Sequence, residues 1–134
     1  MKLAGGCHCG SVRYEVEGDP YTHALCHCSD CRRHAGAPMV GWTMYPEKAL
    51  KITQGTPKIY RSSENGQRQF CAECGTGLFY SNAQTLHGLI DIQSGTYDAP
   101  DEIPARVHIQ VAERIKWMEA VHELPAFERF PPME

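Results

Sequence analysis

The sequence has no long apolar run and no block of like charges, and each absence argues against one class of partner. No stretch approaches the roughly 18 apolar residues of a membrane span, and no apolar segment of signal-peptide length follows Met1. We therefore expect a cytoplasmic protein without a membrane partner. The formal net charge is −3. Because a general nucleic-acid binder usually carries a basic face or stripe, we expect no nucleic-acid partner either.

Internal repeats and low-complexity tracts are also missing. The chain has 134 residues, enough for one domain with a modest core and too few for two, so we expect a single domain over residues 1–134. Its seven cysteines are an odd number, which excludes complete pairing in disulfides. Structural disulfides are rare in the cytosol. The density of cysteines therefore indicates metal binding or reactive thiols.

The cysteines fall into three close groups along the chain. Gly10 and Gly75 follow two of them, and a tight turn around a metal often needs the positive φ that glycine adopts without strain. Thiols this close in sequence can turn inward onto one ion. A single cysteine is often just a small buried apolar residue, but that explanation fits three close groups poorly. The groups are Cys7 and Cys9; Cys26, Cys28 and Cys31; and Cys71 and Cys74.

Seven ligands divide naturally into four and three. Structural zinc usually has four protein ligands, and catalytic zinc has three with an open position. The consecutive group 26–31 can cap one ion in a compact turn, which leaves the four other cysteines for a closed site joining the N-terminus to the middle of the chain. A single four-cysteine site with three spare thiols satisfies the same count. We expect two Zn²⁺ ions per chain.

Between the cysteine groups the pattern is typical of short strands. Polar and apolar residues alternate over residues 11–17, and turn signals such as Gly55-Thr56-Pro57 separate the segments. Many short strands with frequent Gly and Pro predict a mainly β fold with little helix. The expected strands cover residues 11–17, 39–45, 58–61, 77–80, 86–92 and 106–111, the fourth as the second arm of a hairpin that leaves the last cysteine group.

The C-terminal quarter contains two segments with different patterns. Apolar residues from Val111 to Val121 roughly fit one face of a helix, so a helix is possible there. The tail over residues 124–132 contains three prolines and cannot form a regular helix.

Three motifs, over residues 6–14, 26–31 with Gly36, and 70–75, resemble the glutathione-dependent formaldehyde-activating enzyme family, which includes centromere protein V. Weaker matches follow at residues 88–91, Trp117 and residues 124–128. The resemblance implies a β-tent fold of small antiparallel sheets stapled by zinc. It also implies a structural zinc on Cys7, Cys9, Cys71 and Cys74, and an exchangeable active-site zinc on Cys26, Cys28 and Cys31.

The family's reaction adds glutathione to formaldehyde and gives S-hydroxymethylglutathione, a carbon–sulfur lyase activity. The resemblance thus implies a thiol such as glutathione and a small aldehyde as substrates. Three thiolates and one Zn²⁺ sum to −1, and such an ion keeps a fourth, external thiol deprotonated. Arg32 and Arg33 follow Cys31 and could offset the added charge or meet glutathione carboxylates. The competing interpretation is that both arginines are solvated surface residues.

The histidines near the triad leave alternatives open. His27 or His34 could be a fourth ligand and close the second site. Alternatively, His34 could shuttle the proton between thiol and hemithioacetal oxygen as a catalytic residue. Asp91 stays outside the predicted site, because a lone carboxylate at a strand end is usually a turn or solvent residue.

Three functions are compatible with these residues. The leading hypothesis is a zinc-dependent lyase joining a thiol and a small aldehyde. The alternative is a non-catalytic zinc-binding interaction module, and the third is a metal or thiol-redox role for the triad. A purely structural site prefers four ligands, so a group of three favours chemistry.

Overall fold

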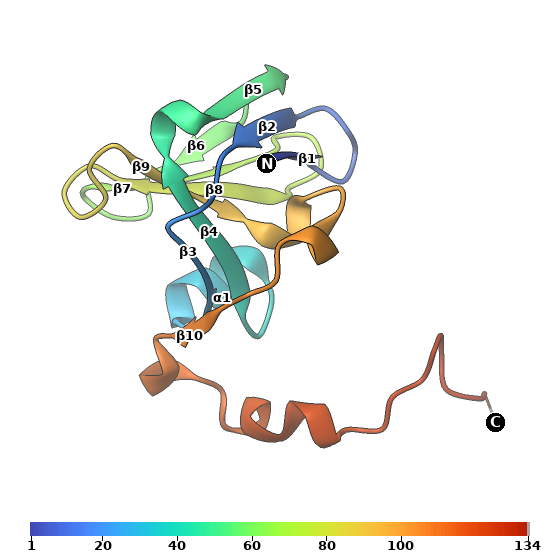
Figure 1. Cartoon of the computed structure of the whole chain (residues 1–134). Coiled ribbons are helices and arrows are strands. Elements are labelled where there is room, and N and C mark those ends of the chain that lie inside the picture. Colours follow the sequence, from blue (N-terminus) through green and yellow to red (C-terminus); the bar gives the residue numbers. More distant parts are fainter. Residues whose placement is uncertain (134) are drawn as a thin grey trace.

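The computed structural model describes residues 1–133, which form two β-sheets built from short strands (Figure 1). The smaller sheet is antiparallel, with the order β1-β2-β5. The larger has the order β10-β3-β4-β9-β8-β7-β6 and is antiparallel except for the parallel pair β10 and β3. The strands are β1 (Lys2–Gly6), β2 (Arg13–Glu17), β3 (Thr22–Cys26), β4 (Val40–Pro46), β5 (Leu50–Gln54), β6 (Lys58–Tyr60), β7 (Gly66–Phe70), β8 (Gly77–Asn82), β9 (Leu89–Gln93) and β10 (Val107–Ile109).

Helical structure is limited in the described residues. The α-helix α1 (Ser29–Ala35) has seven residues, and within residues 1–133 no helix has the length and apolar content that crossing a bilayer requires. Short 3₁₀ segments complete the fold: η1 (Glu47–Ala49), η2 (Ser94–Thr96), η3 (Pro100–Glu102), η4 (Val111–Glu113) and η5 (Lys116–Glu123). The prediction of a mainly β fold with little helix is confirmed.

All six expected strands form, as β2, β4, β6, β8, β9 and β10. The expected hairpin also forms, since β7 and β8 pair on either side of the last cysteine group. Four strands and α1 were not expected. The sequences of β1 (KLAGG) and β7 (GQRQF) lack the β-branched residues that favour strands, so pairing with their neighbours, and not local propensity, makes them extended.

The region from Val111 to Val121 forms 3₁₀ turns and no α-helix. Ala120 interrupts η5 with φ −115° and ψ 20°, and Met118 is its one buried residue. The apolar spacing therefore does not bury a helical face here. Residues 124–132 form no regular helix, as their prolines predicted.

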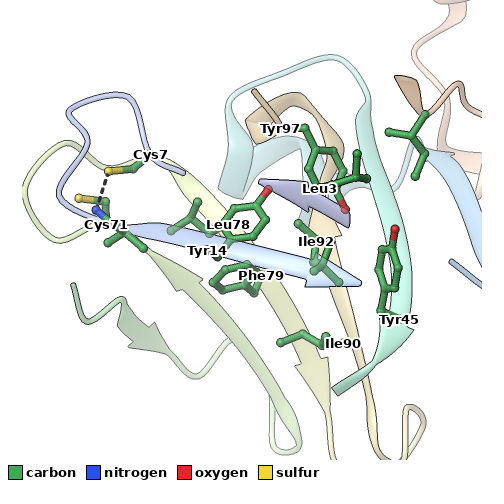
Figure 2. Close-up of a cluster of buried hydrophobic side chains, with 13 residues drawn as sticks. Leu3, Cys7, Tyr14, Tyr45, Cys71, Leu78, Phe79, Ile90, Ile92 and Tyr97 are labelled. Atoms are coloured by element: carbon green, nitrogen blue, oxygen red, sulfur yellow. Dashed lines mark hydrogen bonds between the residues drawn. The ribbon is translucent and has the colours of Figure 1, made fainter. Parts of the chain in front are cut away.

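The main core lies between the two sheets (Figure 2). Alternation turns Ile90 and Ile92 of β9 toward Tyr14 and Val16 of β2. Phe79 of β8 joins them, with its ring centroid 5.2 Å from that of Tyr14 in an edge-on arrangement. This packing fixes which face of the larger sheet is turned inward.

The opposite face of the larger sheet carries the second, smaller core cluster. Cys26, Val40 and Trp42 pack there with Cys31 of α1, and Tyr80 lies half-buried beside them. Figure 1 shows α1 next to β3 and β4. We call this surface the site face, because the three clustered cysteines at residues 26–31 lie on it.

The packing predicts a clear difference between core and edge positions of the same sheet. Phe79→Ala is expected to lower the unfolding free energy by about 3–5 kcal/mol, because it removes a fully buried ring and leaves a cavity. Ile59→Ala on the edge strand β6, where Ile59 is 52% exposed, should change it by well under about 1 kcal/mol. Denaturant unfolding at constant metal content measures both, and equal losses would contradict the assigned core.

Candidate active site and metal centres

The first cysteine cluster joins the start of the chain to its middle. The ligand atoms of its four members all lie within 4.8 Å of one another. The Sγ atoms of Cys7 and Cys9 are 3.7 Å apart, and those of Cys9 and Cys71 are 3.8 Å apart. Four sulfurs bound tetrahedrally to zinc at 2.3 Å stand about 3.8 Å from one another. The cluster, which Cys74 completes, therefore has the spacing of a closed metal site.

Two similar turns build this cluster. Gly10 donates its N–H to the carbonyl of Cys7 at 3.2 Å, and Gly75 donates to the carbonyl of Cys71 at 2.8 Å. Both glycines have positive φ, 83° and 81°, as the sequence predicted. The turns leave Cys7 and Cys71 buried at one end of the main core (Figure 2).

The pKa values of the thiols in the first cluster shift in both directions. Those of Cys7 and Cys74 are lowered, whereas burial and the hydrogen bonds shared with Cys7 and Cys74 raise that of Cys71 to about 11. Hydrogen bonds with the hydroxyl and backbone of Thr76 lower the pKa of the Cys74 thiol to about 5. The backbone N–H of Val12 donates to Cys7 Sγ at 3.2 Å. Since metals bind thiolates, these donors prepare the cluster for a cation.

The second cluster comprises Cys26, Cys28 and Cys31, whose sulfurs also lie within 4.8 Å of one another. Cys26 ends β3, Cys28 is the N-cap of α1, and Cys31 lies in its first turn. Cys28 Sγ accepts the backbone N–H of Cys31 at 3.3 Å, a capping contact made by a thiol in place of the usual hydroxyl or carboxylate. The short helix thus gathers the triad.

One thiol of this triad is prepared as a thiolate. The hydrogen bond with Cys26, followed by those with Cys28 and Arg68, lowers the pKa of the Cys31 thiol to about 5. The hydrogen bond that Cys26 shares with Cys31, together with burial, raises the pKa of the Cys26 thiol. Of the three thiols, Cys31 is therefore the one whose pKa the surroundings lower.

No histidine joins the triad. Within residues 1–133, no imidazole nitrogen or carboxylate oxygen forms a metal-binding group with the three sulfurs inside 4.8 Å. His27 is buried, and its Nε2 shares a hydrogen bond of 2.9 Å with His108 Nδ1. His34 instead stacks on Tyr60, with centroids 5.9 Å apart and rings 6° from parallel. The arrangement is a three-thiol site without a fourth ligand from these side chains.

The residues predicted to contact substrate, Arg32, Arg33 and His34, all lie in α1 but differ in exposure and in their contacts. Arg32 donates from Nε to the carbonyl of His27 at 3.2 Å and from a terminal nitrogen to the carbonyl of Glu113 at 3.4 Å. Arg33 is exposed. Burial, and then the charge of Arg68, lowers the pKa of His34, so its imidazole is neutral at pH 7.

Arg68 is the residue of this face that sequence reasoning missed. It is buried in β7, and its two terminal nitrogens lie 3.8 and 3.9 Å from Cys31 Sγ. Its guanidinium carbon stands 4.8 Å from the ring centroid of Tyr80. Only the pairing of β7 with β8 and the packing of α1 bring Arg68 to the triad, 37 residues from Cys31 in the sequence.

Asp91 also belongs to this face. It lies in the middle of β9, opposite Tyr80, so its interpretation as a strand-end turn or solvent residue is wrong. Burial, and then the negative charge of Cys31, raises the pKa of Asp91 to about 7. A carboxyl group whose pKa is raised toward neutrality by burial and by a nearby cysteine is typical of functional sites.

Comparison with known proteins agrees with this architecture. A sequence model of the family described as "Glutathione-dependent formaldehyde-activating enzyme" matches residues 2–113. A protein of Halomonas elongata, provisionally named as such an enzyme, is 28% identical over 127 residues, covering 89% of this chain and 81% of its own.

Two further proteins are less similar in sequence. An uncharacterized lyase of Schizosaccharomyces pombe is 26% identical over 77 residues, 58% of this chain and 56% of its own. A crystal structure of a Rhodobacter sphaeroides protein superposes with a TM-score of 0.63 at 23% identity, covering 81% of this chain and 99% of that one. That likeness shows a common fold.

The position of Asp91 predicts a specific pH dependence of stability. The folded protein holds this proton more tightly than the unfolded chain, so its stabilisation is full below the ordinary Asp pKa of 3.8 and is lost as pH rises to about 7. Asp91→Asn should therefore lose less unfolding free energy than the unsubstituted protein between about pH 5 and pH 8.

Denaturant unfolding at both pH values, with metal content matched, measures this difference. Asp101→Asn replaces an exposed carboxylate and should follow the unsubstituted protein. Parallel pH curves for Asp91→Asn and the unsubstituted protein would contradict the raised pKa.

Proposed function

This chain belongs to the glutathione-dependent formaldehyde-activating enzyme family, and on that premise we propose that it is a zinc-dependent carbon–sulfur lyase. The proposed reaction adds the thiol of glutathione, or of a related compound, to formaldehyde or another small aldehyde. The observation that carries the proposal is the three-thiol cluster on the site face, which no fourth side chain in the described residues completes. A binding module would need no open position.

The residues divide between two proposed zinc ions. Cys7, Cys9, Cys71 and Cys74 would hold a structural ion, since they supply four thiols at tetrahedral spacing. Cys26, Cys28 and Cys31 would hold the second ion at the active site. A zinc ion at that second site would keep an added thiol deprotonated and fixed in position.

The protein's own side chains would position the substrates and move the proton. The thiol loses its proton on binding, and the adduct oxygen gains one when the carbon–sulfur bond forms, so no proton is consumed overall. His34 is neutral at pH 7 and near the triad, which suits it to carry this proton. Arg33 is exposed and Arg32 is partly held by backbone carbonyls, so Arg33 is better placed to meet a glutathione carboxylate.

The reaction is tested by exchange NMR on glutathione and formaldehyde at equilibrium. Zinc-loaded protein should accelerate exchange between free thiol and adduct, and Cys28→Ser should abolish that acceleration with the loss of one zinc per chain. Asp30→Asn, an exposed substitution in the same helical turn, is the matched control and should leave it unchanged.

If the unsubstituted protein causes no acceleration, formaldehyde activation is excluded, and another thiol substrate or the interaction module becomes the better hypothesis. The module also predicts that Cys28→Ser loosens the whole domain. The lyase predicts a folded variant without activity.

The two clusters should differ in their effect on stability. Cys71→Ser is expected to lower the unfolding free energy by several kcal/mol more than Cys28→Ser, because the first cluster joins β1 to β7 and reaches the main core. Chemical unfolding with zinc counted per chain measures the comparison. Equal losses for the two variants would contradict a structural first site and an active second one.

A further inference from the structure

Arg68 is a buried cation without an acidic partner in the described part of the chain. Its residue is 6% exposed, and the ion pairs among residues 1–133 are Lys2 with Glu15 and Arg13 with Asp98. A buried arginine normally pairs with a carboxylate, because an uncompensated charge away from water is costly. The hydrogen-bond acceptor that Arg68 finds here is Cys31 Sγ.

The geometry holds the guanidinium in one orientation. Arg68 pairs across the strands with Tyr80, which pairs with Asp91, so the three side chains follow one another in a row on the site face. The ring of Tyr80 lies against the guanidinium, at 4.8 Å from centroid to carbon. Two terminal nitrogens then meet the same sulfur at 3.8 and 3.9 Å, in the fork that arginine offers to an anion.

The charge at the triad explains why a cation is needed. Three thiolates with one Zn²⁺ carry −1, and an external thiolate in the open position brings the group to −2. Asp91 adds a further negative charge when it is ionised. Arg32, which sequence reasoning offered as compensation, donates to the carbonyls of His27 and Glu113. Arg68, by contrast, contacts a triad sulfur directly.

We propose that Arg68 is the positioning residue of the second site, which holds Cys31 as a thiolate toward the metal and offsets the charge of an incoming external thiolate. The second part rests on the function proposed above. Arg68 acts through Cys31 and does not form or break a bond of the substrate. Its presence should make the site select an anionic thiolate over a neutral ligand of the same metal.

Cobalt-substituted protein tests this selection, since its visible absorption reports each ligand added to the metal. Titration with glutathione and separately with imidazole, a neutral ligand, gives two affinities for each variant. Arg68→Met should weaken glutathione binding by about ten- to a hundredfold and imidazole binding by less than about threefold. Arg68→Lys keeps the charge but not the fork, and should recover most of the glutathione affinity.

Two controls separate a charge effect from a folding defect. Arg61→Met removes an exposed cation that follows β6 and should change neither affinity. Far-UV circular dichroism and metal content of the first cluster verify that each variant is folded. If Arg68→Met does not fold, Arg68→Lys and Arg68→Gln are compared in the same titrations. The proposal is overturned if Arg68→Met, or Arg68→Gln where Arg68→Met does not fold, weakens both ligands equally or weakens neither.

A second measurement keeps this inference distinct from the proposed function. Competition with a chromophoric chelator, without any thiol, gives the metal affinity of the triad, which Arg68→Met should lower by about tenfold because Cys31 loses its cationic partner. If unsubstituted protein binds no external thiol, the lyase hypothesis fails and the thiolate selection fails with it. An unchanged metal affinity in Arg68→Met would overturn the role of Arg68 on Cys31.

Discussion

The rest of the structure depends on the cross-strand register of the seven-stranded sheet. Because side chains alternate between the two faces of a strand, the pairing that turns Ile90, Ile92 and Phe79 into the main core turns Asp91 and Tyr80 to the other side. A slip of one residue would exchange the two sets. Because the core takes the apolar side chains of these strands, Arg68, Tyr80 and Asp91 lie on the opposite face, next to α1. The packing that stabilises the fold therefore also positions the residues of the site.

The two cysteine clusters differ in how the chain builds them. The first gathers four thiols from two distant glycine turns and closes around its centre, which suits a staple. The second draws three thiols from one strand end and one helical turn, and the sheet beneath it contributes Arg68. Its surroundings shift the pKa values of Cys31 and Asp91 in opposite directions, and strongly shifted pKa values are a common feature of functional sites.

Most of the strands and both cysteine clusters could be predicted from the sequence, because alternation and close ligand spacing are local signals. β1 and β7 could not, since their glycines and polar residues become extended only through pairing. Nor could α1, which is seven residues long and capped by a thiol that also belongs to the triad. The apolar spacing after Val111 suggested an α-helix, but the segment forms 3₁₀ turns. Met118 is the one residue of η5 that is buried, so no apolar helical face packs against the rest of the protein there.

The sequence by itself determined the number and grouping of the thiols, the four-and-three division as the natural one, and the mainly β class. It could not determine what surrounds the triad. Tyr60, Arg68, Tyr80 and Asp91 come from four strands and become neighbours through successive pairings. Each pairing depends on contacts between distant segments, so no local pattern reveals that an arginine in β7 meets a cysteine in α1. Only the tertiary structure decided which charges face the thiols, because long-range register sets those distances.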